Sequence, residues 1–123
     1  MARKDAQIAW FLELMAAAGE MSARRMFGGT GLYADGLMIA LEADGTLYLK
    51  TDDHSRARFD DAGGVPFVFE AKSRGRTITT HYLTPPDEAL DSADAMRPWA
   101  LLALRAAHRA AVKKAPRTRK RGL

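Results

Sequence analysis

Two Asp-Gly pairs, at residues 35–36 and 44–45, constrain the fold of this chain more than any other feature. They separate three runs of alternating residue character, at residues 30–34, 37–42 and 46–50. Asp-Gly readily adopts the positive φ angles of a two-residue hairpin turn, and alternation with a period of two is typical of strands. We therefore predict three antiparallel strands in the middle of the chain.

The alternation also assigns side chains to the two faces of this sheet. Leu37, Ile39 and Leu41 share one face, and Leu47 and Leu49 join them from the next strand. This apolar face is predicted to form the core, and the opposite face is free to meet a partner if no helix covers it. The opposite, mixed face carries Met38, Ala40, Glu42, Tyr48 and Lys50.

Helices are predicted on both sides of these strands. The first residues of the chain show the apolar spacing of a helix, with Asp5 as its N-cap and Gly19 as its stop. After the third strand, a short helix is expected to begin at a cap formed by Thr51 or Asp52.

Two further strands, at residues 65–71 and 76–83, and a long terminal helix complete the predicted domain. Pro98 either begins this helix or kinks it. The elements together predict an α+β fold with two layers, in the order α-β3-α-β2-α, in which helices cover one face of a largely antiparallel sheet of about five strands. The apolar seam of the terminal helix is predicted at Trp99, Leu102, Ala103, Ala106 and Ala110.

The glycine-rich stretch RRMFGGTGLYADG, residues 24–36, raises the question of a phosphate-binding loop. Such a loop needs a helix whose N-terminus faces the anion, whereas a strand–turn–strand pattern follows here. We interpret the glycines as a bend or bulge in a strand. The alternative is a functional surface, in which Arg24, Arg25 and Tyr33 receive an acidic partner.

Catalytic and metal-binding patterns are not found. The chain has no cysteine, which excludes disulfides, thiolate metal sites and a cysteine nucleophile. His54, His81 and His108 fall in three different predicted elements and lack the spacing of shared metal ligands. Asp52 and Asp53, beside His54, are interpreted as acids at a helix start. We expect no catalytic residue, no cofactor and no metal site.

Aromatic residues recur on the predicted strands. Their pattern permits two interpretations, packing in the core or stacking of nucleic-acid bases on an open sheet. The basic-aromatic motif of RNA-binding sheets is missing, so we favour core packing. The residues concerned are Tyr33, Tyr48, Phe67, Phe69 and Tyr82.

The positive charge of the chain is concentrated at its end. Lys and Arg number 19 against 15 Asp and Glu, but six of the cations lie in the last eleven residues. Without them, 13 Lys and Arg stand against 15 acids, so the predicted domain, residues 1–112, is mildly acidic. The tail, residues 113–123, is either a weak, non-specific nucleic-acid contact or a solubilising end. Its candidate contacts are Lys113, Lys114, Arg117, Arg119, Lys120 and Arg121.

Several separated motifs, taken in this order, resemble the TfoX N-terminal-domain family. The most specific are RMFGG at residues 25–29, GLY at 31–33, LYLK at 47–50 and the Pro66-Phe67 pair. The resemblance covers about residues 5 to 111 and implies a two-layer α+β domain without assigned catalytic residues. The regulators that name the family are transcription co-activators of natural competence that act with the cyclic-AMP receptor protein. They carry a second, helical C-terminal domain, whereas only the basic tail follows here, so fold kinship alone does not transfer their role.

We therefore expect a non-enzymatic regulatory domain that binds another protein and forms a homodimer. Its further partner is unknown, a transcription factor being one possibility. The alternatives are an accessory nucleic-acid binder that uses the tail, and a small-molecule-binding or catalytic domain that uses the bend at residues 24–33. No signal peptide or membrane span is present, so a cytoplasmic location is expected. The candidate interaction surface comprises Arg24, Arg25, Gly28, Gly29, Tyr33, Met38 and Tyr48.

Overall fold

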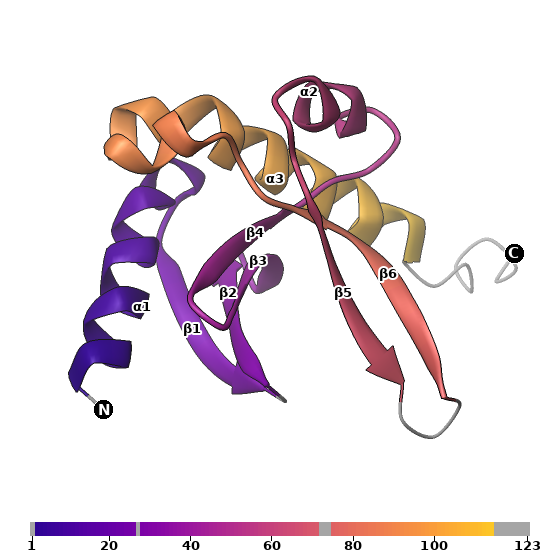
Figure 1. Cartoon of the computed structure of the whole chain (residues 1–123). Helices are drawn as coiled ribbons and strands as arrows, with labels where there is room; N and C mark the ends of the chain where they lie inside the picture. The colour runs from indigo at the N-terminus through magenta and orange to yellow at the C-terminus, as the bar shows by residue number, and fades with distance from the viewer. Residues whose placement is uncertain (1, 27, 72–74, 115–123) are drawn as a thin grey trace, which may run out of the picture.

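The computed structural model describes residues 2–26, 28–71 and 75–114 (Figure 1). The helices are α1 (Ala2–Leu14), η1 (Ala16–Ala18), α2 (Arg56–Asp61), η2 (Asp87–Asp91) and α3 (Ala93–Lys114). The strands are β1 (Met21–Met26), β2 (Gly29–Ala34), β3 (Leu37–Ala43), β4 (Thr46–Lys50), β5 (Pro66–Ala71) and β6 (Arg76–Leu83).

The strands form one antiparallel sheet in the order β1-β2-β3-β4-β6-β5, which confirms the predicted α+β fold. The sheet has six strands where about five were predicted, because β1 was not foreseen. Strand β1 lies at an edge and most of its side chains are exposed. An edge strand without a buried face leaves no alternation of apolar residues in the sequence, which explains the omission.

Both predicted Asp-Gly turns are confirmed. Asp35 and Gly36 have φ angles of 55° and 74°, and Asp44 and Gly45 have φ angles of 51° and 83°. Positive φ at both central residues is the geometry of the hairpin turn that matches the twist of the flanking strands. These two turns set the pairing of β2 with β3 and of β3 with β4.

The predicted division of β3 between two faces is partly wrong. Leu32 pairs with Ala40, but the next residue of β2 pairs with Met38, so Ile39 is an extra residue in the ladder. This bulge places Ile39 and Ala40 on the same face and reverses the alternation beyond it. Ala40 and Glu42 therefore lie on the core side, and Leu41, opposite Tyr48, lies on the other side.

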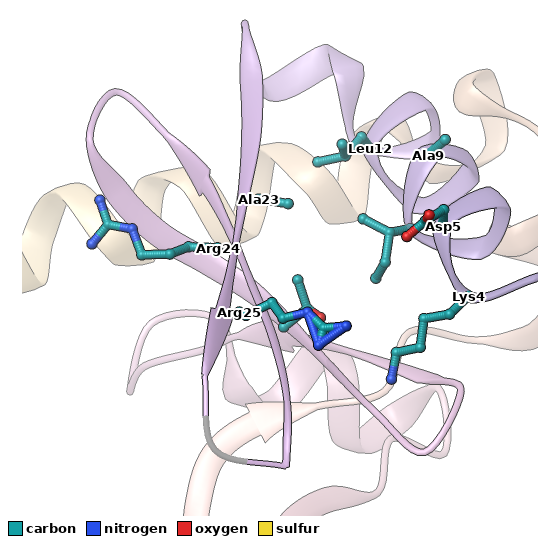
Figure 2. Close-up of a pocket in the computed structure, with 9 residues that line it drawn as sticks. Lys4, Asp5, Ala9, Leu12, Ala23, Arg24 and Arg25 are labelled. Atoms are coloured by element: carbon teal, nitrogen blue, oxygen red, sulfur yellow. The ribbon is translucent and has the colours of Figure 1, made fainter. Parts of the chain in front are cut away.

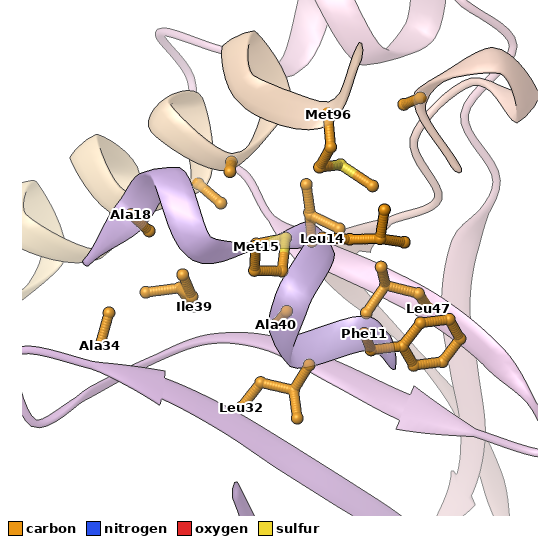
Figure 3. Packing of buried hydrophobic residues seen from close by; sticks show 14 of the residues in the cluster. Phe11, Leu14, Met15, Ala18, Leu32, Ala34, Ile39, Ala40, Leu47 and Met96 are labelled. Carbon is orange, nitrogen blue, oxygen red and sulfur yellow. The ribbon is translucent and has the colours of Figure 1, made fainter. Parts of the chain in front are cut away.

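The core lies between the helices and one face of the sheet. Every helix contributes to it, and Figure 3 shows side chains of α1 held between α3 and the sheet. Helix α1 begins at Ala2, with Asp5 in its first turn, so the predicted N-cap at Asp5 is wrong. The fully buried large side chains include Met15, Leu32, Ile39, Leu49, Phe59, Leu83 and Met96.

Helix α3 packs on this core through small residues. Ala103 and Ala106 of the predicted seam are fully buried, while Ala100 and Ala107, which were not predicted, are buried beside them. Alanine lets a helix axis approach the strands closely. Pro98 lies inside the helix, six residues from its start, so it does not begin it. None of the described helices has the length and apolar character that a membrane span requires.

Candidate interaction face

The side of the sheet that faces away from the core carries the candidate site. Cross-strand partners share a face, so the pairs Arg24–Gly31, Tyr33–Met38 and Lys50–Tyr82 identify this side. None of its residues belongs to the core that the helices cover. We call it the open face, and it comprises Arg24, Met26, Tyr33, Met38, Leu41, Tyr48, Lys50, Phe67, Phe69, Ile78 and Tyr82.

Two methionines meet over a glycine on the open face. A β-carbon built on Gly31 would lie 2.9 Å from the Sδ atoms of both Met26 and Met38. The missing side chain therefore leaves the space in which the two thioethers lie. The glycines of this stretch are structural, as interpreted from the sequence, because Gly28 turns the chain with a φ of 68° and β2 follows directly.

An aromatic row continues the open face onto β5. The ring centroids of Tyr48 and Phe67 are 5.1 Å apart, and those of Phe67 and Phe69 are 6.0 Å apart. The prediction of core packing for these aromatics is wrong, since the helices bury the opposite side of the sheet. Phe69 is 44% exposed, and Ile78 pairs with it on the neighbouring strand.

Two cations of the open face lie over tyrosine rings, and one tyrosine hydroxyl is hydrogen-bonded to the backbone. The guanidinium of Arg24 lies 5.0 Å from the ring centroid of Tyr33, and the ammonium of Lys50 lies 5.2 Å from that of Tyr82. The Tyr82 hydroxyl donates a hydrogen bond to the Met38 carbonyl oxygen at 3.4 Å, and burial raises the pKa of Tyr82 to about 12. This surface therefore presents rings, methyl groups and thioethers to solvent.

The structure separates the two arginines of the candidate surface. Figure 2 shows Arg24 and Arg25 on opposite sides of β1. Arg25 faces helix α1, where it lines a pocket of about 280 Å³ together with Lys4 and Asp5. Arg24, Tyr33, Met38 and Tyr48 are brought together on the open face, and Arg25 is not. Gly28 and Gly29 lie at the adjoining turn, where a β-carbon on Gly29 would overlap the Glu42 carbonyl oxygen.

The acids after β4 build a loop before the helix, so the predicted cap at Thr51 or Asp52 is wrong: α2 begins at Arg56 with Ser55 as its N-cap. The Asp52 carboxylate accepts hydrogen bonds from the backbone N–H groups of His54 and Ser55 at 3.0 and 3.2 Å. Arg109 of α3 donates two more, at 2.6 and 2.9 Å. These bonds, led by that of Arg109, lower the pKa of Asp52 to about 2. Asp52 is thus a structural link between this loop and α3.

The remaining candidates lie apart from the open face. His108 and Asp35 form a pair at 3.0 Å on the surface. Among the described residues, no three His, Cys, Asp or Glu side chains gather in a way that would hold a metal ion. Lys113 and Lys114 are exposed at the end of α3, and the other four cations of the tail lie outside the described residues.

Sequence reasoning missed part of the open face. Met26 and Phe69 were not assigned to it, and Leu41 was placed on the other side. The bulge at Ile39 hid the position of Leu41, and β1 was not predicted as a strand. The alternation of Phe67 and Phe69 in β5 was the available signal that one face of this strand is aromatic.

These features define a two-layer α+β domain whose helices cover one face of a six-stranded sheet and whose other face carries an apolar, aromatic surface. The chain belongs to the TfoX N-terminal domain family, whose sequence profile matches residues 13–107. It is also similar to the DNA transformation protein TfoX1 of Aliivibrio fischeri (strain ATCC 700601 / ES114), with 32% identity over 68 residues. The matched segment makes up 55% of this chain and 32% of that protein, so it spans about a third of the relative's length.

Proposed function

We propose that this chain is a non-enzymatic regulatory domain that acts by binding protein through its open face. The observation that carries the proposal is the grouping of exposed apolar side chains on that face. Met26 and Phe69 are each 44% exposed and Ile78 is 36% exposed. Exposed apolar side chains on one face of a sheet typically mark a protein interface.

The family and the relative give this binding a biological setting. The chain belongs to the TfoX N-terminal domain family, and its relative is named for DNA transformation. We therefore place the domain in the regulation of competence, in the cytoplasm, with a transcription factor as the further partner. The absence of cysteine fits a reducing compartment.

A second copy of the chain is the first occupant that we propose for the open face. Strands β1 and β5 are the two edges of the sheet, so pairing about a two-fold axis can cover the aromatic row and an edge together. The charged ends of Arg24 and Lys50 lie over tyrosine rings of the face, so its surface stays largely aromatic and apolar. The homodimer would present the remaining surface to the further partner.

The oligomeric state tests this proposal. Light scattering coupled to gel filtration at tens of micromolar is expected to give twice the 13.5 kDa mass of the chain. Phe69→Ser is expected to give the monomer mass. Val112→Ser is the matched control, because Val112 is 76% exposed on α3 and lies outside the open face. A monomeric wild-type chain, or equal dissociation in both variants, would contradict the dimer.

The further partner is tested in the native cell. Affinity capture with the wild-type chain is expected to retain a protein that the Phe69→Ser variant loses and the Val112→Ser variant keeps. An Arg24→Ala, Arg25→Ala double variant adds a second probe of the candidate surface. Equal retention by all four chains would show that binding does not involve the open face.

We propose nucleic-acid contact through the tail as a second function. The observation that favours it is the position of Lys113 and Lys114, which are exposed where α3 leads into the basic end of the chain. Because the remaining chain is mildly acidic, contact with phosphate backbones would be confined to this end.

A further inference from the structure

A cavity of about 350 Å³ lies away from the core, where the loop after β4, strand β6 and the last turns of α3 meet. Three separate segments of the chain contribute residues to it. The groups that matter here are Lys50, Asp52, His54, His81, Arg109 and Lys113. Nitrogen-bearing side chains dominate this set.

One wall of the cavity is fixed by an ion pair. Arg109 donates to both carboxylate oxygens of Asp52, at 2.6 and 2.9 Å, and Asp52 also accepts two backbone N–H groups of its own loop. The carboxylate is thereby occupied and its charge is balanced. Asp52 still attracts the Lys50 ammonium, but this attraction is smaller than the two effects that oppose it.

The other basic side chains of the cavity have no close ion-pair or hydrogen-bond partner among the described residues. Neither Lys50 nor Lys113 forms an ion pair with any described residue. The rings of His54 and His81 likewise have no hydrogen-bond partner in the described part of the chain. The one remaining carboxylate of the lining, Asp53, is exposed.

Lys50 shows the electrostatic result of this arrangement. Burial, followed by repulsion from the nearby ammonium of Lys114, lowers the pKa of Lys50. Ammonium groups whose mutual repulsion and burial outweigh the attraction of a nearby carboxylate favour a further anion beside them, because each cation is stabilised by the opposite charge.

We propose that this cavity binds the phosphate group of a small phosphorylated molecule. The phosphate contacts Lys113 and the imidazole of His81, with the Arg109–Asp52 pair as a rigid wall and Lys50, whose ammonium lies over the Tyr82 ring, at the margin of the cavity. A phosphate dianion matches several convergent donors better than a single carboxylate does. The volume is that of a pocket for a nucleotide-sized ligand. This inference goes beyond protein binding at the open face, because His81 lies outside that face; it shares Lys113 with the proposed nucleic-acid contact, and the duplex in the test below separates the two.

Nuclear magnetic resonance titrations of the full chain with inorganic phosphate, AMP and adenosine test the proposal. Phosphate and AMP are expected to shift the amides of residues 51–54 and of His81, and adenosine is expected to leave them unchanged. Lys113→Met is expected to weaken AMP binding about tenfold, the loss of one charge-assisted contact. His81→Asn is expected to weaken it by a smaller factor.

The control is Arg97→Met, which removes one positive charge from an exposed site on the same helix outside the cavity. It is expected to leave AMP binding unchanged, and unshifted amides elsewhere show that each variant is folded. The proposal would be overturned by any of three results: adenosine binds as well as AMP, neither phosphate compound shifts the amides, or Arg97→Met weakens AMP binding as much as Lys113→Met does. If a short DNA duplex shifts these amides and AMP does not, the cavity belongs to a nucleic-acid surface and the proposal is equally overturned. None of these results depends on dimerisation through Phe69.

Discussion

Gly29 and Gly31 lie two residues apart in β2, yet an added methyl group would meet different neighbours at the two positions. At Gly29 it would overlap the Glu42 backbone carbonyl, which cannot move without displacing β3. At Gly31 it would meet the flexible ends of Met26 and Met38. We expect Gly31→Ala to lower the free energy of unfolding by about 1 kcal/mol and Gly29→Ala by about 3 kcal/mol. Urea unfolding measures both, and the reverse order would contradict this account.

Asp52 makes a pH-dependent contribution to stability. Its pKa of about 2 in the folded protein lies below the ordinary value of 3.8, mainly because Arg109 donates hydrogen bonds to it. The contribution is therefore complete above about pH 4 and is lost as the pH falls towards about 2. We expect Asp52→Asn to lower the free energy of unfolding by about 1 kcal/mol at neutral pH, since both side chains are partly exposed.

The same difference is expected to shrink at about pH 2.5, where the wild-type carboxylate is partly protonated. Asp53→Asn, at an exposed neighbour outside this network, is the control and is expected to have little effect at either pH. Denaturant curves for the three chains at both pH values provide the measurement. A difference that persists unchanged in acid would show that the Asp52 charge is not the source of the stability.

At the scale of elements, the β5–β6 hairpin is held less firmly than the rest of the sheet. Only two residue pairs, Leu49–Leu83 and Lys50–Tyr82, join β4 to β6, and Figure 1 shows the hairpin diverging from the other strands. We expect amides in the outer part of the hairpin, at residues 68–71 and 75–79, to exchange with solvent at least tenfold faster than those of β3. Hydrogen exchange followed by nuclear magnetic resonance measures this, and equal protection would contradict it.

The elements also show which parts of the fold were accessible from sequence. Strands β2, β3, β4, β5 and β6 were predicted within one residue at each end, because turn residues and alternation marked them. Strand β1 was missed, since it has no buried face to impose a pattern. The sides of Ala40 and Leu41 were assigned wrongly, because the bulge at Ile39 depends on pairing with β2 and leaves no local mark.

At the scale of the whole molecule, positive charge and apolar surface are placed in different regions. The cationic end begins at the close of α3, whereas residues 1–112 carry more acids than bases. We expect a chain that ends at Val112 to lose most of its affinity for duplex DNA and its dependence on salt, while a dimer through Phe69 persists. Fluorescence anisotropy over a range of salt concentrations measures this. Equal affinity of the two chains would exclude the tail.

The candidate site itself was only partly predictable. Met38 and Tyr48 were assigned to one face from strand alternation, Tyr33 was added as a residue beside the glycine bend, and the structure places all three on the open face. Their neighbours Phe67 and Tyr82 come from a hairpin that is distant in sequence, so no local pattern joins them to the first three. The cavity near Lys113 could not be foreseen for the same reason, because three segments that are distant in sequence form it.

The two thioethers that flank Gly31 have a consequence for selectivity. Methionine is unbranched and polarisable, so Met26 and Met38 can change conformation at little cost and fit different outlines. A protein that binds there would contact side chains that can change conformation, instead of a rigid surface. Homologous partners of slightly different shape would then bind with only small losses of affinity. One such domain would be able to bind several of them.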